Sequence, residues 1–112
     1  MQANNNIYYF PKYPYKKQFY FTKKELSAIF SLYGQMVKSG LWKDYSIDAL
    51  GDRAIFSVYK KSNTMPIYKI EKKDSQEKKR NFFRIISNSG NTLKRYESVD
   101  RVVKFFELKK TA

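Results

Sequence analysis

Three aspartates are the clearest set of side chains here that could bind a cation or exchange a proton: Asp44, Asp48 and Asp52. Asp44 and Asp48 alternate with apolar residues, a pattern typical of a strand, so their carboxylates should share one face. Residues four apart on a strand lie about 13 Å apart, too far for both to hold one ion directly. We therefore interpret these acids as solvated partners of nearby lysines and Arg53, and we predict no metal site.

Enzymatic readings find little support in the residue types. The chain has no histidine and no cysteine, so Ser-His-Asp and Cys-His arrangements are impossible and zinc would lack its usual ligands. Histidine is also the usual general base near neutral pH. The four glycines are too scattered for a P-loop or a dinucleotide fingerprint. We predict a non-enzymatic domain with no catalytic residue, no cofactor and no evident small-molecule substrate.

Positive charge is the strongest signal in the composition. There are 23 lysines and arginines against 10 acids, which gives a formal net charge of +13. Such an excess is typical of nucleic-acid-binding domains. A second explanation stays open, because the cations are mostly lysine and the chain is rich in Asn, Tyr, Ile and Phe, all with A/T-rich codons. Genome composition could produce that bias, although it explains the shortage of acids less well.

The charge is concentrated in residues 60–95, which hold eleven cations and three acids. In the last predicted hairpin, a two-residue turn sets Arg84 opposite Arg95, whereas a three-residue turn sets it opposite Lys94. Like charges facing each other destabilise a strand pair, and a bound anion such as phosphate would relieve the repulsion. Our candidate polyanion-binding residues are Lys69, Lys72, Lys78, Lys79, Arg80, Arg84, Lys94, Arg95, Tyr68 and Tyr96.

Aromatic residues accompany these cations, and single-stranded nucleic acid is commonly held by stacking on aromatic side chains beside Lys and Arg. Tyr59, Tyr68, Phe83 and Tyr96 could stand on the open face of a sheet, and the alternative is that most of these aromatic residues belong to the core. A second candidate contact lies near the N-terminus, at Tyr8, Tyr9, Tyr13, Tyr15, Lys16 and Lys17. The favoured partner is RNA or a ribonucleoprotein surface. The alternative is a protein-protein adaptor that uses this N-terminal arm.

The elements that must position these residues can be read along the chain. Residues 1–21 form an aromatic and basic arm, residues 22–108 a single α+β domain, and residues 109–112 a frayed tail. Thr22 and Glu25 make a capping box, which predicts a helix that ends at Ser39 and Gly40. Strands are expected around residues 44–50, 53–58, 67–72, 81–88 and 92–97, followed by a helix from Ser98. The fold prediction is a five-stranded antiparallel meander with both helices on one face.

The first strand pair has a specific predicted register. Gly51 and Asp52 offer a two-residue turn, which places Leu50 opposite Arg53 and the apolar residues of both strands on one face.

No targeting or membrane segment is evident. The longest early apolar run is Ile7–Phe10, and no stretch approaches the roughly 20 apolar residues that span a bilayer. With the absence of cysteine, this predicts a cytoplasmic protein with no membrane partner.

Three segments carry a resemblance to a known family: Ser31–Leu50, Asp52–Lys61 and Pro66–Lys72. From about Phe21 to the last helix, the chain resembles an uncharacterised family of short basic bacterial proteins, known from alphaproteobacteria as a domain of unknown function. The resemblance implies no activity, ligand or functional residue. The chain departs from that family in its Lys-rich aromatic arm and at Gly51, where the resemblance leads us to expect a larger residue.

Overall fold

Helix α1 (Lys23–Lys38) begins and ends where the sequence predicts. The computed structural model describes residues 19–61, 65–75 and 80–110. At the start of α1, the Thr22 hydroxyl accepts from the Glu25 amide at 3.1 Å, and the Glu25 carboxylate accepts from the Thr22 amide at 2.8 Å. At its end, Gly40 adopts a φ of 76°, where a side chain would be strained. Both caps of the predicted helix are therefore confirmed.

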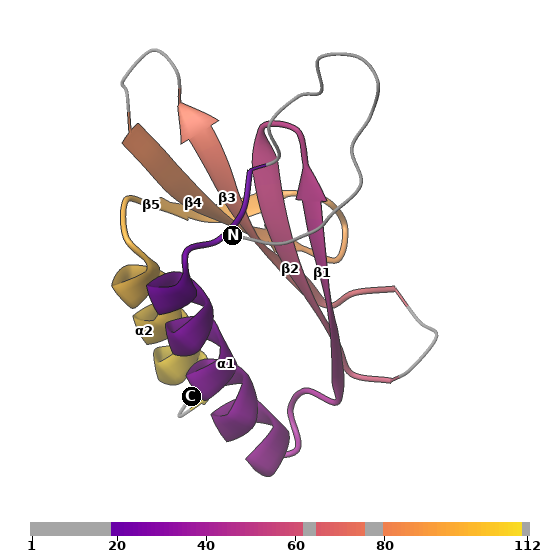
Figure 1. Cartoon of the computed structure of the whole chain (residues 1–112). Coiled ribbons are helices and arrows are strands. Elements are labelled where there is room, and N and C mark those ends of the chain that lie inside the picture. The colour runs from indigo at the N-terminus through magenta and orange to yellow at the C-terminus, as the bar shows by residue number, and fades with distance from the viewer. Residues whose placement is uncertain (1–18, 62–64, 76–79, 111–112) are drawn as a thin grey trace, which may run out of the picture.

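Five strands follow in one antiparallel meander whose spatial order equals their chain order. The last element is helix α2, and both helices lie on the same side of the sheet (Figure 1). The predicted α+β fold is confirmed. The strands are β1 (Asp44–Leu50), β2 (Arg53–Tyr59), β3 (Tyr68–Ser75), β4 (Arg80–Ser87) and β5 (Thr92–Tyr96), and α2 spans Val99–Lys110.

Several element boundaries differ from the prediction, most of them by one residue, and the ends of β3 and α2 by more. Strand β3 starts at Tyr68 and continues to Ser75, into a charged run predicted to be a loop, and α2 continues through Lys109 and Lys110. Charge alone does not end a strand whose backbone still pairs, and lysines in a last helical turn favour the helix dipole. The predicted N-terminal arm lies outside the described residues except for Phe19–Phe21.

The β1–β2 hairpin has the predicted register. Leu50 pairs with Arg53 across the Gly51–Asp52 turn, and Ile47 pairs with Phe56 on the face toward the helices. Gly51 has a φ of 46°, in the left-handed region that favours glycine. This backbone geometry explains why a larger residue, which the family resemblance suggested, is not needed at this position.

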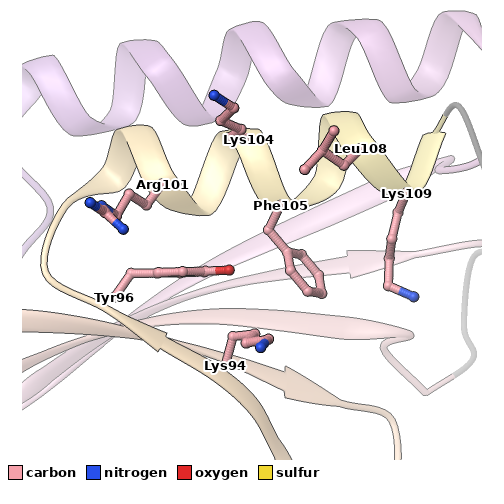
Figure 2. A pocket seen from close by; sticks show the side chains of 7 residues that line it. All are labelled: Lys94, Tyr96, Arg101, Lys104, Phe105, Leu108 and Lys109. Atoms are coloured by element: carbon pink, nitrogen blue, oxygen red, sulfur yellow. The ribbon is translucent and has the colours of Figure 1, made fainter.

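The β4–β5 hairpin resolves the two registers left open above. Arg84 pairs with Arg95. The register then shifts by one residue, so that Ile85 pairs with Lys94 but Ile86 pairs with Thr92. Figure 2 shows α2 running between α1 and β5. Lys94, opposite Ile85, consequently faces the helix layer.

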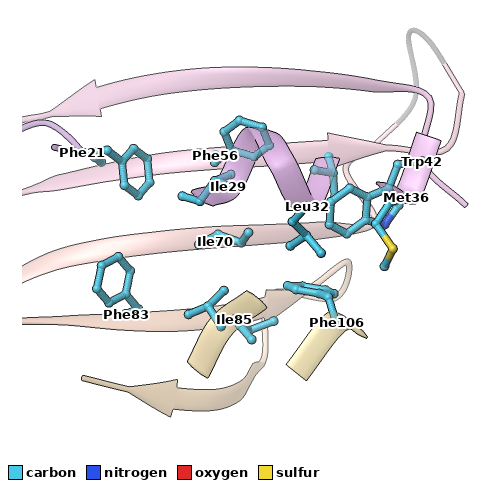
Figure 3. Close-up of a cluster of buried hydrophobic side chains, with 13 residues drawn as sticks. Phe21, Ile29, Leu32, Met36, Trp42, Phe56, Ile70, Phe83, Ile85 and Phe106 are labelled. Atoms are coloured by element: carbon cyan, nitrogen blue, oxygen red, sulfur yellow. The ribbon is translucent and has the colours of Figure 1, made fainter. Parts of the chain in front are cut away.

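The hydrophobic core fills the space between the sheet and the two helices (Figure 3). The ring of Trp42, just after α1, meets the ring of Phe106 edge to face at 5.2 Å. Fully buried side chains from both layers include Ile29, Leu32, Phe56, Ile70, Ile85 and Phe106. No helix among the described residues is long and apolar enough to cross a membrane.

Lys72 is a charged residue inside this apolar interface. Its Nζ lies 2.8 Å from Glu25 Oε1 and 3.2 Å from the Tyr20 carbonyl, and it sits 4.9 Å from the centre of the Phe19 ring. The Lys72 side chain is 3% exposed and that of Glu25 18%. Because Glu25 also completes the capping box, one carboxylate both starts α1 and holds it to β3.

Replacing Lys72 with alanine should lower the free energy of unfolding by about 3 kcal/mol, because it leaves Glu25 without its countercharge in a nearly buried position. Combining Lys72→Met with Glu25→Gln should recover most of that loss, since glutamine can still serve the capping box. Urea denaturation of the two variants and the parent measures both effects. A Lys72→Ala protein as stable as the parent would contradict the proposed anchoring.

Candidate anion-binding groove

Glu71 is the centre of a charge cluster on the sheet face opposite the helices. Glu71 is only 1% exposed, although its side chain lies on the sheet face that no helix covers. Oε1 accepts from Arg84 Nε and Nη2, both at 2.6 Å, and Oε2 accepts from Arg53 Nη1 at 3.1 Å. Arg84 also donates to Thr92 Oγ1 at 3.2 Å. The acceptors for the Arg84 guanidinium therefore come from within the chain.

The cluster continues toward the β1–β2 turn. Asp52 pairs with Arg53 at 3.2 Å and with Lys73 at 3.4 Å. The hydrogen bond from Arg53 is the main reason that the pKa of Asp52 lies below its usual value, and the same bond raises the pKa of Arg53. Asp44 and Asp48, by contrast, enter none of the ion pairs formed among the described residues.

Arg84 and Arg95 are paired across the hairpin, as one of the two predicted registers requires, but other residues of the chain compensate both charges. Glu71 neutralises Arg84, and the guanidinium of Arg95 stacks 3.8 Å from the centre of the Phe82 ring. Arg80 pairs with Glu97 at 3.2 Å, with both side chains largely exposed. An external anion is thus not needed to explain this hairpin.

The remaining predicted residues divide between the two faces of the sheet. Tyr68, Phe83 and Tyr96 face the helices, which corrects the expectation that they lie on the open face; Tyr68, for example, packs its ring 5.1 Å from that of Phe106. Strand alternation explains the error, because they share the parity of buried Ile70 and Ile85. Lys72 faces the same way, whereas Tyr59 and Lys69 lie on the helix-free face, the former as predicted. Candidates outside the described residues are Lys78, Lys79, Tyr8, Tyr9, Tyr13, Tyr15, Lys16 and Lys17.

A groove between β5 and α2 collects a different set of cations. Its volume is about 460 Å³, and Lys94 and Tyr96 line it from β5 (Figure 2). Alternate residues of a strand share a face, and residues spaced by three and four share a helix face, so each element presents a single side to the groove. From α2 the lining residues are Arg101, Lys104, Phe105, Leu108 and Lys109.

The charges of this groove are uncompensated within the described part of the chain. Four lining side chains are cationic and none is acidic. None of the ion pairs formed by the described residues includes Lys94, Arg101 or Lys104, and Lys109 Nζ lies 5.7 Å from the centre of the Phe105 ring. Cations gathered over an apolar floor attract an anion with an apolar or aromatic part.

Sequence reasoning found only Lys94 and Tyr96 of this site. The sequence analysis assigns no binding role to the residues of α2 and places Lys109 in a frayed tail. The available signal was the spacing of Arg101, Lys104 and Phe105, which puts two cations and one ring on one helix side. Among the described residues no group of three acidic side chains could hold a metal ion.

The comparison with protein families gives the chain a family but no function. Residues 19–103 match the family model described as "Protein of unknown function (DUF2794)". The chain belongs to this family. The DUF2794 match covers every strand and the first turn of α2, and it stops before Lys104, Phe105 and Lys109. No curated protein and no solved structure was found to match the chain.

Glu71→Gln should destabilise the protein by about 2 kcal/mol, because it leaves Arg84 without a countercharge and Arg53 with Asp52 alone. Asp52→Asn removes an exposed partner of the same cluster and should have a much smaller effect. Thermal unfolding of both variants at one salt concentration gives the comparison. Equal losses for the two variants would contradict the central role of Glu71.

Proposed function

We propose that this DUF2794 chain is a non-enzymatic binding domain that holds an anionic ligand, foremost single-stranded RNA, in the groove between β5 and α2. The observation that carries the proposal is the set of four cations around an apolar floor that have no ion-pair partner among the described residues. Phosphates need only positioned cations, whereas bases need flat apolar surfaces on which to stack. The groove offers both kinds of group within one surface.

The helix-free face of the sheet is a weaker candidate for the same role. Arg84, Arg80 and Lys73 each have an internal carboxylate partner there. An incoming phosphate would have to displace Glu71 from Arg84, which would leave this buried carboxylate with Arg53 as its remaining partner. The groove cations carry no such cost, and this difference favours the groove.

A ribonucleic acid ligand also suits the composition. The net charge of +13 attracts polyanions over the whole surface and speeds encounter, while the groove would supply the fixed contacts. We place the protein in the cytoplasm, in keeping with an RNA ligand and with the absence of cysteine. The alternative, a protein-protein adaptor, would not require binding that weakens with salt.

Affinity for a fluorescent oligouridylate, measured by polarisation in the full chain, should fall steeply with salt. If four phosphates are neutralised, the slope of log affinity against log salt should be about −3. Arg101→Glu combined with Lys104→Glu should lower the affinity by about tenfold or more and make the slope shallower.

The matched control reverses two exposed lysines in the other helix, Lys23→Glu with Lys24→Glu, which gives the same change in net charge. This control should keep most of the affinity. Equal losses in the two double variants would mean that only net charge matters, and the groove would lose its assigned role.

A further inference from the structure

The β1 side of the sheet carries a second exposed surface that the groove does not explain. β1 is the first strand of an open sheet and pairs only with β2 among the described strands, so its outer backbone groups lack a strand partner there. On its helix-facing side, Tyr45 is 40% exposed and Ile47 42%, beside Phe30 at 37%. The rings of Phe30 and Tyr45 lie 5.2 Å apart. An apolar strip therefore runs along a free sheet edge.

This edge has the opposite charge to the rest of the chain. Asp44 and Asp48 lie on the other face of β1 and have no ion-pair partner among the described residues. The Tyr33 hydroxyl donates a hydrogen bond to the Lys43 carbonyl at 3.0 Å. The pKa of Tyr33 is raised, mainly by burial and to a smaller extent by the negative charge of Asp44. An extended cationic segment with apolar side chains could hydrogen-bond to the β1 backbone, cover the apolar strip and pair its cations with Asp44 and Asp48.

The chain itself contains a segment of that chemistry. Residues 1–18 have no acid, and they combine Lys12, Lys16 and Lys17 with five aromatic residues. Pro11 and Pro14 lack an amide proton, and because they are three residues apart, only one of them can turn that position to solvent in a regular edge strand. The composition of this segment complements the β1 surface in charge and in apolar character.

The tether is long enough. Phe19 lies beside Lys72, which pairs with Ala54, and Ala54 pairs with Ala49 of β1. Two strand spacings, about 10 Å, therefore separate the start of the segment from β1. Eighteen extended residues reach up to about 60 Å. A tether of this kind gives a local concentration in the millimolar range, which makes even a weak contact favourable.

We propose that residues 1–18 dock along β1 of the same chain, as an added edge strand whose aromatic side chains cover the strip of Phe30, Tyr45 and Ile47. Docking would also place the segment's lysines beside Asp44 and Asp48. This inference is independent of the groove, which lies at the β5 edge of the sheet, at the opposite end of the strand order.

The absence of cysteine allows a direct test in the full chain. A nitroxide attached to Asn5→Cys should broaden the amide NMR signals of β1, above all that of Ile47, and the reduced label should restore them. Asp44→Lys with Asp48→Lys should abolish most of the broadening. The control, Asp100→Lys with Glu107→Lys on α2, makes the same charge change and should leave the broadening unchanged.

A mixing experiment separates one chain from two. Isotope-labelled chain without the nitroxide is combined with unlabelled chain that carries it. Broadening of β1 in the mixture would assign the contact to a second copy and overturn docking within the chain. Absence of broadening in every sample, or equal loss in the two double variants, would overturn the docking itself.

Discussion

Two adjacent and oppositely charged residues in the central strand organise this molecule. Glu71 and Lys72 of β3 are each almost completely buried, and strand alternation points them to opposite faces of the sheet. Burying a charge costs several kcal/mol unless a partner compensates it. Lys72 therefore requires Glu25 of α1, which fixes the helix layer, and Glu71 requires Arg53 and Arg84, which fixes the cations of the other face.

This constraint decides which cations are left for a partner. The arginine nearest the centre of the sheet, Arg84, already serves Glu71, and Lys72 serves Glu25. At the β5 edge, by contrast, Lys94 lines the groove together with Arg101 and Lys104 of α2, and no acidic residue lines it. Internal acids thus neutralise the central part of the sheet, whereas none of the ion pairs among the described residues neutralises the cations that line the groove.

The sequence predicted features that depend on neighbours along the chain. Thr22 and Glu25 predicted the start of α1, and Gly51 predicted the register of the β1–β2 hairpin. Both features depend on residues only a few positions apart in the sequence. The predicted anion-binding residues do not share one surface. Tyr68, Lys72 and Tyr96 face the helices, although the sequence groups them with the cations of the other sheet face. The groove depends on how α2 lies across β5, and no local pattern specifies that packing.

Mapping backbone amide shifts in the full chain during a titration with oligouridylate tests the central claim most directly. The account predicts that the shifts concentrate in 94–96 and 101–109, while the amides of Arg53, Glu71 and Arg84 change little. Shifts centred on those three residues would mean that the ligand competes for the arginines held by Glu71. That result would contradict a division between an internally neutralised sheet and a free groove.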